Sequence, residues 1–373
     1  MSILSPDNLP TLRPHLLKGD LTIEEIAFFV SKLKENFTTN RKSIGDYQKS
    51  IELVSSYTAF YLPSNFKKSV KTFEFLLPKI RNLNPEEIEL FDIGCGPGTM
   101  SLAYSSELIK LFPEIKIIVN LVDSSLLMLE QAKKLFAAFL PTVQVFSYGP
   151  NEFLKSSDES GFELKISLFG NSVNEFGEKL FFEYLNKTSP KFICLLSPGN
   201  KDRFPKLLGI KSILESKKGF KIVYPCISPY AKCPVAENDW CHQVLRVKND
   251  PEFERVSQKA KINRRNLAYI FHLYERSLPI LSNEQNDLEN KEGTILQFLG
   301  KNKACYRWRV CFLEDDSDRL KIFNAELPLR GLSKAELKSI DKLQVGDRFT
   351  FKIKKFVNES TIRIVIFMIS IQN

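Results

Sequence analysis

A glycine-rich turn lies between a predicted strand and a predicted helix, and it constrains the fold more than any other feature of the sequence. The segment Glu89-Leu-Phe-Asp-Ile-Gly-Cys-Gly-Pro-Gly-Thr99 follows an apolar run and precedes a helical stretch. Glycine adopts positive φ angles readily and lets a ligand approach the backbone closely. The sequence therefore predicts a cofactor site on a strand-to-helix turn at 94–98.

An acidic residue, Asp123, ends the next predicted strand. In nucleotide-binding α/β folds an acid at this position accepts hydrogen bonds from ribose hydroxyls. The form Asp92-Ile-Gly-Cys-Gly-Pro-Gly98 resembles the S-adenosylmethionine methyltransferase superfamily, and the resemblance implies that Asp92 lies near the methionine moiety. A nicotinamide cofactor is the runner-up, and a turn retained only for packing is the alternative to any cofactor.

Short apolar runs alternate with helical stretches through the centre of the chain, as in βαβ units with a parallel sheet. Apolar positions at helical spacing precede them, and strand-like alternation follows a polar stretch, 281–295, that suggests a linker. We predict a doubly wound α/β sheet of the class I methyltransferase type with a small C-terminal β-domain, an open barrel. The predicted parts are a helical region at 1–88, a methyltransferase-like domain at 89–280 with a cysteine-rich loop at 225–242, and a β-domain at 296–373.

Polar residues follow the fourth apolar run, where ligands meet the carboxyl ends of parallel strands. Asn174 and Glu175 are the candidates for contact with cofactor or substrate, and a helix-capping role for Asn174 is the alternative. The full set predicted to contact the cofactor is Asp92, Gly94, Cys95, Gly96, Gly98, Asp123 and Asn174.

The formal net charge of +9 favours a polyanionic partner such as RNA, although a lysine-rich solubilising surface has the same charge. One segment combines dense basic residues with aromatic ones. We expect it to contact phosphates and stack on unpaired bases, with a solvated helix face as the alternative. Its residues are Arg255, Lys259, Lys261, Arg264, Arg265, Tyr269 and Phe271.

No stretch of about 20 apolar residues is present, which argues against a membrane span. The N-terminus lacks a basic start with an apolar run, and its acidic residues fit an organellar presequence poorly. Seven cysteines, an odd number, do not suggest a secreted disulfide framework. We expect a monomer in the bacterial cytoplasm, with a mitochondrial location less favoured.

Cys226, Cys233 and Cys241 lie close together in a predicted loop, and two of them adjoin prolines. Such a set of thiols can bind a soft metal or an iron–sulfur cluster. A fourth ligand must come from elsewhere, and with a histidine the set would suit zinc. The candidates are Cys311, Cys305 and His242.

The segments Pro225-Cys226, Cys233-Pro234 and Trp240-Cys241-His242 resemble the methyltransferase-like assembly factor family of the small ribosomal subunit, known from mitochondria and from bacteria. The match covers most of the chain. Its other segments are Ala59-Phe-Tyr-Leu-Pro63, the glycine turn, Asn174-Glu175, Pro198-Gly199 and Tyr269 to Arg276.

This resemblance implies a role on small-subunit ribosomal RNA or its precursor, and a 4Fe-4S cluster held by four cysteines. Cys226, Cys233 and Cys241 match three of the family's ligands. The fourth lies in a later strand followed by a polar turn, which the sequence around Cys311 resembles better than that around Cys305.

The chain departs from the family pattern at two positions. Ser228 stands where the family typically has histidine, and Ser197 stands where it has an acidic residue before Pro-Gly. The second departure weakens a catalytic role for that loop, and the sequence identifies no catalytic base. Three functions follow as hypotheses: an RNA methyltransferase of small-subunit maturation, a noncatalytic assembly factor with the same fold, and a small-molecule methyltransferase with a structural zinc.

Overall fold

The computed structural model describes residues 5–38, 50–157, 161–229, 231–235, 239–277, 291–313 and 319–369. By its internal contacts the chain divides into two compact units, each made from two stretches of sequence. Unit 1 comprises Met1–Ser197 and Arg246–Leu267, and unit 2 comprises Pro198–Leu245 and Ala268–Asn373.

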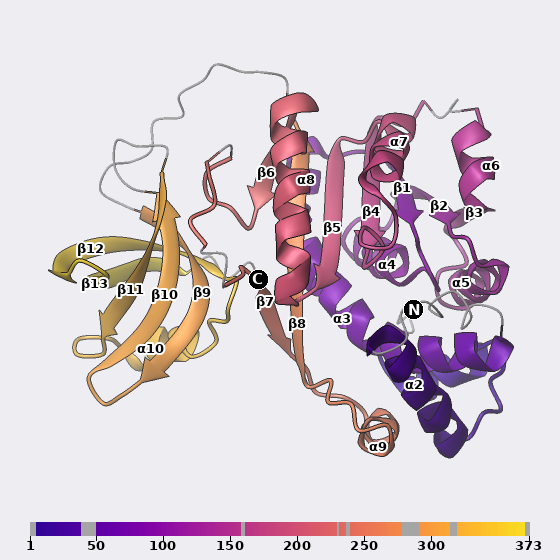
Figure 1. Cartoon of the computed structure of the whole chain (residues 1–373), viewed down its shortest axis with the longest axis horizontal. Coiled ribbons are helices and arrows are strands. Elements are labelled where there is room, and N and C mark those ends of the chain that lie inside the picture. The colour runs from indigo at the N-terminus through magenta and orange to yellow at the C-terminus, as the bar shows by residue number, and fades with distance from the viewer. Residues whose placement is uncertain are drawn as a thin grey trace. The chain divides into compact units, whose positions relative to one another are not determined.

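Five parallel strands in the order β3-β2-β1-β4-β5 form the sheet of unit 1 (Figure 1). Their bounds are Glu87–Ile93 (β1), Lys116–Val122 (β2), Gln144–Tyr148 (β3), Leu164–Gly170 (β4) and Phe192–Pro198 (β5). Ile88 of β1 lies opposite both Ile117 of β2 and Leu164 of β4, and most strand residues are buried. The strand order reverses between β1 and β4, which is where doubly wound folds bind ligands at the carboxyl ends of their strands.

Helices make up the rest of unit 1. Their bounds are Leu9–Leu12 (α1), Ile23–Thr38 (α2), Ile51–Leu83 (α3), Thr99–Leu111 (α4), Leu126–Phe139 (α5), Pro150–Lys155 (α6), Glu178–Thr188 (α7) and Pro251–Lys259 (α9), with a 3-10 turn, η1, at Arg13–His15. The long helix α3 begins at the N-cap Ser50, whose hydroxyl accepts from the Leu53 amide, and ends at Asn84 in a left-handed conformation. It packs on α4, where the hydroxyls of Thr72 and Tyr104 lie 3.0 Å apart.

Unit 2 begins with a 3-10 turn and a helix, followed by short strands. Their bounds are Lys201–Arg203 (η3), Phe204–Lys217 (α8), Phe220–Tyr224 (β6), Gln243–Arg246 (β7) and Asn266–Arg276 (β8). β6 and β7 both pair with β8, and β6 runs antiparallel to it. The cysteine-rich segment lies between β6 and β7.

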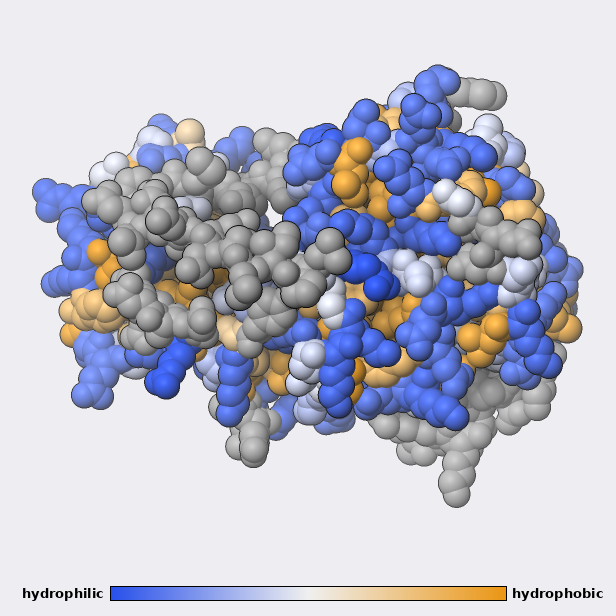
Figure 2. All heavy atoms as spheres, turned by 90° about the horizontal axis from the view of Figure 1, so that it is seen from above, coloured by the Kyte–Doolittle hydropathy of each residue, from blue (hydrophilic) through white to orange (hydrophobic). Residues whose placement is uncertain are grey.

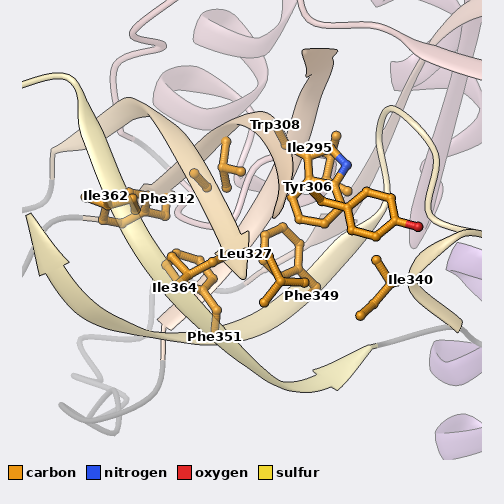
Figure 3. Close-up of a cluster of buried hydrophobic side chains, with 12 residues drawn as sticks. Ile295, Tyr306, Trp308, Phe312, Leu327, Ile340, Phe349, Phe351, Ile362 and Ile364 are labelled. Atoms are coloured by element: carbon orange, nitrogen blue, oxygen red, sulfur yellow. The ribbon is translucent and has the colours of Figure 1, made fainter. Parts of the chain in front are cut away.

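A closed barrel of five strands, in the order β10-β11-β13-β12-β9, forms the remainder of unit 2 (Figure 1). Its elements are Lys291–Lys301 (β9), Cys305–Leu313 (β10), Leu320–Pro328 (β11), Lys334–Ile340 (α10), Arg348–Asn358 (β12) and Thr361–Ile369 (β13). Aromatic and branched side chains fill its interior, as Figure 3 shows, and the rings of Tyr306 and Trp308 stack with their centroids 5.3 Å apart.

Two expectations about this region are wrong. The barrel is closed and not open, because β9 pairs with β12 as well as with β10. The predicted linker extends too far, because β9 begins at Lys291, whereas 281–290 lie outside the described residues. Gly293 looked like part of a polar linker, but a Cβ there would lie 2.6 Å from Val310 Cγ1 and 2.7 Å from the Phe351 ring.

The predicted fold class is confirmed: a doubly wound α/β sheet with a helical N-terminal region, a cysteine-rich insert and a separate C-terminal β-structure. The domain boundaries 1–88, 89–280 and 296–373 stay predictions. The division into two units by internal contacts has other bounds. On the described residues in Figure 2, hydrophilic side chains alternate with smaller apolar areas. Within the described residues, no helix has the length and apolar character needed to cross a bilayer.

Candidate functional site

The glycine turn after β1 has the backbone geometry that its sequence predicts. Gly94, Gly96 and Gly98 have φ angles of 67°, 54° and 72°, which side chains with a Cβ rarely adopt. A Cβ on Gly94 would lie 2.4 Å from Ser172 Cβ, whereas one on Gly96 would meet no described atom within 4 Å. Gly94 therefore permits close packing, and Gly96 leaves its backbone accessible to a ligand.

Asp123, directly after β2, is bonded to this turn. Its Oδ2 accepts a hydrogen bond of 2.8 Å from the Gly96 amide, and its Oδ1 accepts one of 2.9 Å from the Ser125 amide. Burial raises the pKa of the carboxyl group. A carboxylate oxygen has two acceptor sites, so both oxygens can still accept hydrogen bonds from a ligand.

Asp92 lies near the end of β1, and only one of its two carboxylate oxygens accepts hydrogen bonds from described residues. Its Oδ2 accepts hydrogen bonds from the amide and hydroxyl of Ser101, at 3.1 and 2.7 Å. Its Oδ1 is buried and has no hydrogen-bond partner among the described residues. Burial raises the pKa of Asp92 to about 7. A buried acceptor left unbonded is costly, so this oxygen suits a ligand that donates hydrogen bonds.

One pocket gathers most of the residues predicted to contact a cofactor. Asp92, Gly94, Cys95, Gly96 and Asp123 all line it, together with Glu175. Gly98 and Asn174 do not. Gly98 is the N-cap of α4 and packs against Ala132, and the Asn174 amide donates to Ser197 Oγ at 2.8 Å.

Several pocket residues were not predicted from the sequence. Asn171, after β4, has a φ of 66° and a buried Oδ1 without a described partner. Tyr57, Asn65 and Ser69 of α3 also line the pocket. The signals were present: a polar run follows β4, and the three α3 residues share one side of a helix.

Two cations lie near these α3 residues: Arg264, which is partly buried, and Lys68, a buried residue of α3 itself. Arg264 donates from Nε to Ser64 Oγ at 2.6 Å and from Nη2 to Asn65 Oδ1 at 3.1 Å, and its guanidinium lies 5.0 Å from the Tyr61 ring. Lys68 is 5% exposed, and burial, with a contribution from Arg264, lowers its pKa to about 7. Arg264 thus holds Asn65 at the pocket wall.

The basic segment differs from what its sequence suggested. Tyr269 and Phe271 are 2% and 0% exposed, so the expectation that they stack on bases is wrong. They belong to a buried strand, β8, which alternation alone did not reveal. Arg265 pairs with Glu254 at 2.8 Å and Lys259 with Glu24 at 3.1 Å. Much of this segment's positive charge is therefore engaged within unit 1.

Four cysteines line a second pocket, which lies within unit 2. Cys226 follows β6, Cys233 lies in the loop, Cys241 precedes β7 and Cys311 lies in β10. Neither Cys305 nor His242 lines it, and the His242 ring stacks on Trp240 with centroids 5.0 Å apart. Within the described part of the chain, no three His, Cys, Asp or Glu side chains are arranged to hold a metal ion.

Burial and the charge of Lys211 have opposite effects on the pKa of thiols in this pocket. Burial raises the pKa of Cys226 to about 12, and it also raises the pKa of Cys233, Cys241 and Cys311. The charge of Lys211 lowers the pKa of Cys226 and Cys233 in opposition to burial, and its ammonium lies 2.6 Å from Glu215 in a buried salt bridge.

His272 of β8 also lines the cysteine pocket and was not predicted. It is 2% exposed, its Nδ1 lies 2.9 Å from the Tyr274 hydroxyl, and burial lowers its pKa to about 3. It is therefore a neutral imidazole at physiological pH. A histidine inside an apolar run gives no sequence signal of this placement.

Comparisons with known proteins give a family. Residues 52–283 match the family model described as "Mitochondrial small ribosomal subunit Rsm22". A search of curated proteins gives no match. Among solved structures, the chain resembles a candidate class I S-adenosylmethionine-dependent methyltransferase from Listeria monocytogenes, with 12% identity, a TM-score of 0.38, and coverage of 70% of this chain and 82% of that one. It also resembles a candidate RNA methyltransferase from Pyrococcus horikoshii, with 10% identity, a TM-score of 0.32, and coverage of 51% and 75%.

Proposed function

The chain belongs to the Rsm22 family of the mitochondrial small ribosomal subunit, and we propose that it binds S-adenosylmethionine and acts on small-subunit ribosomal RNA during ribosome assembly. The observation that carries this proposal is the pocket where Asp92, Asp123 and the glycine turn meet. The bacterial cytoplasm and a monomeric state, expected from the sequence, remain part of the proposal.

The electrostatics of the pocket favour a cationic cofactor over a dinucleotide. S-adenosylmethionine carries an ammonium group that can donate to the unpartnered Oδ1 of Asp92, and ribose hydroxyls that can donate to Asp123. A nicotinamide dinucleotide would bring two negative phosphates to the same turn. The pocket already holds two buried acids, Asp123 and Asp92, and in its ionised form Asp92 repels negative phosphates.

If the protein is a catalyst, the pocket residues contribute by positioning. The cofactor supplies an activated methyl group, so the protein must hold an acceptor nucleotide in line with it. Glu175 lines the pocket. A noncatalytic assembly factor is the second candidate, because Ser197 is buried and bonded to Asn174 where the family has an acidic residue.

We also propose that Cys226, Cys233, Cys241 and Cys311 hold a 4Fe-4S cluster. On such a cluster each thiolate binds a different iron atom, whereas four ligands of zinc must meet at one point. Cys226, Cys233, Cys241 and Cys311 border one pocket, and four cysteines are the usual ligand set of such a cluster. Lys211 lowers the cost of deprotonating two of them.

Calorimetry with S-adenosylmethionine and a methyl-transfer assay on immature small subunits test the main proposal. Binding together with transfer supports the enzyme, and binding without transfer to any pre-ribosomal substrate supports the noncatalytic factor. Absence of binding by the intact protein would overturn the cofactor assignment.

Iron and sulfide analysis after anaerobic purification tests the cluster. We expect iron and acid-labile sulfide in equal amounts. Zinc at full occupancy without iron would overturn the cluster proposal, and together with a lack of ribosomal association it would favour a small-molecule methyltransferase.

A further inference from the structure

The barrel of unit 2 has the topology of the oligonucleotide/oligosaccharide-binding fold. In chain order its five strands are β9, β10, β11, β12 and β13, and they close in the order one-two-three-five-four. The third and fifth strands are parallel, with Asn324 opposite Thr361, and α10 lies between the third and fourth. Barrels of this fold bind ligands through loops such as the one between their last two strands. Topology alone does not assign a ligand, which depends on the side chains of the surface.

Apolar side chains are exposed beside the turn between β12 and β13. Phe356 is 64% exposed and Val357 is 43% exposed. The ring of Phe356 lies 6.1 Å from that of Phe323, which in turn lies 5.5 Å from the buried ring of Phe312. The exposed ring is therefore supported by a row of aromatic residues that extends from the barrel core.

Basic residues flank Phe356 in β12 and lie in the paired strand β13. Lys354 and Lys355 precede Phe356, and both are exposed and form no salt bridge with the described residues. Lys355 lies opposite Arg363 in the pairing of β12 with β13. Arg363 and Arg307 share the single carboxylate of Glu326, at 3.1 and 3.4 Å. Lys354, Lys355, Phe356, Val357 and Arg363 are called the β12–β13 patch.

A second phenylalanine of the barrel is exposed, but the lysine near it is paired with an acid. Phe298 of β9 is 50% exposed, but the nearby Lys301 forms a salt bridge of 3.0 Å with Asp341. On the barrel, at the left of Figure 2, a small apolar area borders hydrophilic side chains. An exposed aromatic ring next to uncompensated cations distinguishes the β12–β13 patch from an ordinary surface.

We infer that the β12–β13 patch binds single-stranded RNA, with a base stacked on Phe356 and phosphates next to Lys354 and Lys355. Aromatic rings stack on any unpaired base, and lysines follow the backbone charge. In duplex RNA the bases are paired and stacked on each other, so this patch should discriminate against it. The inference deepens the proposed function and rests on it, since it gives the factor an RNA-binding surface separate from the cofactor pocket.

Fluorescence anisotropy of the full chain with a labelled, mixed-sequence single-stranded RNA 12-mer tests this inference. Phe356→Ala should weaken binding about tenfold or more, and Phe356→Trp should preserve it. The matched control Phe298→Ala should change binding less than about twofold. Replacing both Lys354 and Lys355 with glutamine should flatten the dependence of log K on log salt by about 0.7 for each phosphate that is no longer neutralised.

Equal affinities of the Phe356→Ala and Phe298→Ala variants, or equal binding of duplex and single-stranded RNA, would overturn the inference. So would binding to anionic lipid vesicles that Phe356→Ala abolishes while RNA binding persists. Calorimetry with S-adenosylmethionine on the same variants separates the two proposals. Lack of cofactor binding by the wild type, with intact and Phe356-dependent RNA binding, would refute only the cofactor site.

Discussion

The amide of Gly96 donates a 2.8 Å hydrogen bond to Oδ2 of Asp123, so the glycine turn after β1 and the acid after β2 are joined without a ligand. The bond fixes the carboxylate at the carboxyl ends of two adjacent parallel strands. A site fixed in this way loses less conformational entropy when it binds.

Asp123→Asn should weaken S-adenosylmethionine binding by at least about tenfold, because the new amide nitrogen cannot accept a hydrogen bond from a backbone amide or a ribose hydroxyl. Calorimetry gives the affinity, and thermal unfolding shows whether the variant is folded. Asp202→Asn, in the 3-10 turn η3, is a control that lies outside the pocket. Unchanged affinity in a folded Asp123→Asn variant would contradict the assignment.

Asp92 should make stability without ligand depend on pH. Its pKa is raised from 3.8 to about 7, so between these values the native state retains a proton that the unfolded state has lost. Stability from this group is complete below about pH 4 and is lost as the pH rises through 7. Asp92→Asn should therefore increase the free energy of unfolding at pH 8 by roughly 1–4 kcal/mol and have little effect at pH 4. Urea unfolding at both pH values measures this, and an equal effect at both would contradict it.

Cys311→Ser should reduce iron and sulfide retention, whereas Cys305→Ser should leave both unchanged. Cys311 lines the pocket with Cys226, Cys233 and Cys241, whereas Cys305 does not. Elemental analysis of anaerobically purified protein is the measurement. Wild-type iron content in the Cys311 variant would exclude it as the fourth ligand.

Lys68→Met should stabilise the chain, most strongly below pH 7. The folded pKa of Lys68 is lowered from 10.5 to about 7, so stability from this group rises with pH between those values and the buried charge is costliest below them. We expect a gain of roughly 1–3 kcal/mol at pH 6 that shrinks toward pH 9. Lys67→Met, next in the helix but only partly buried, should change unfolding by less than about 0.5 kcal/mol. A loss of stability in Lys68→Met at pH 6 would show that an undescribed partner compensates the charge.

The parts of the site that follow from local sequence were predictable. A glycine turn between a strand and a helix and an acid at the next strand end have a fixed geometry, and Asp92, Gly96 and Asp123 meet at one pocket. Asn171 and Asn174 lie in one polar run, but Asn171, with a left-handed backbone, lines the pocket, whereas Asn174 bonds to Ser197.

Residues brought together over long distances were less predictable. Asn65 reaches the pocket through the packing of α3, and Arg264, which bonds to it, has the sequence context of a surface cation. Cys311 lies near the cysteine loop because β10 is part of the barrel. The spacing of cysteines in the sequence does not predict this placement. Resemblance to a family, and not periodicity, favours Cys311 over Cys305.

Unit 1 is discontinuous in sequence, since it needs Arg246–Leu267 after an excursion through Pro198–Leu245. When a ribosome has synthesised the chain as far as Pro198, every strand of the unit 1 sheet has been made. Arg264, whose guanidinium bonds to Asn65 and Ser64, has not yet been made. The α3 wall of the pocket at the glycine turn therefore becomes complete only after translation passes residue 264. A nascent chain of this protein should acquire its sheet before this pocket is complete.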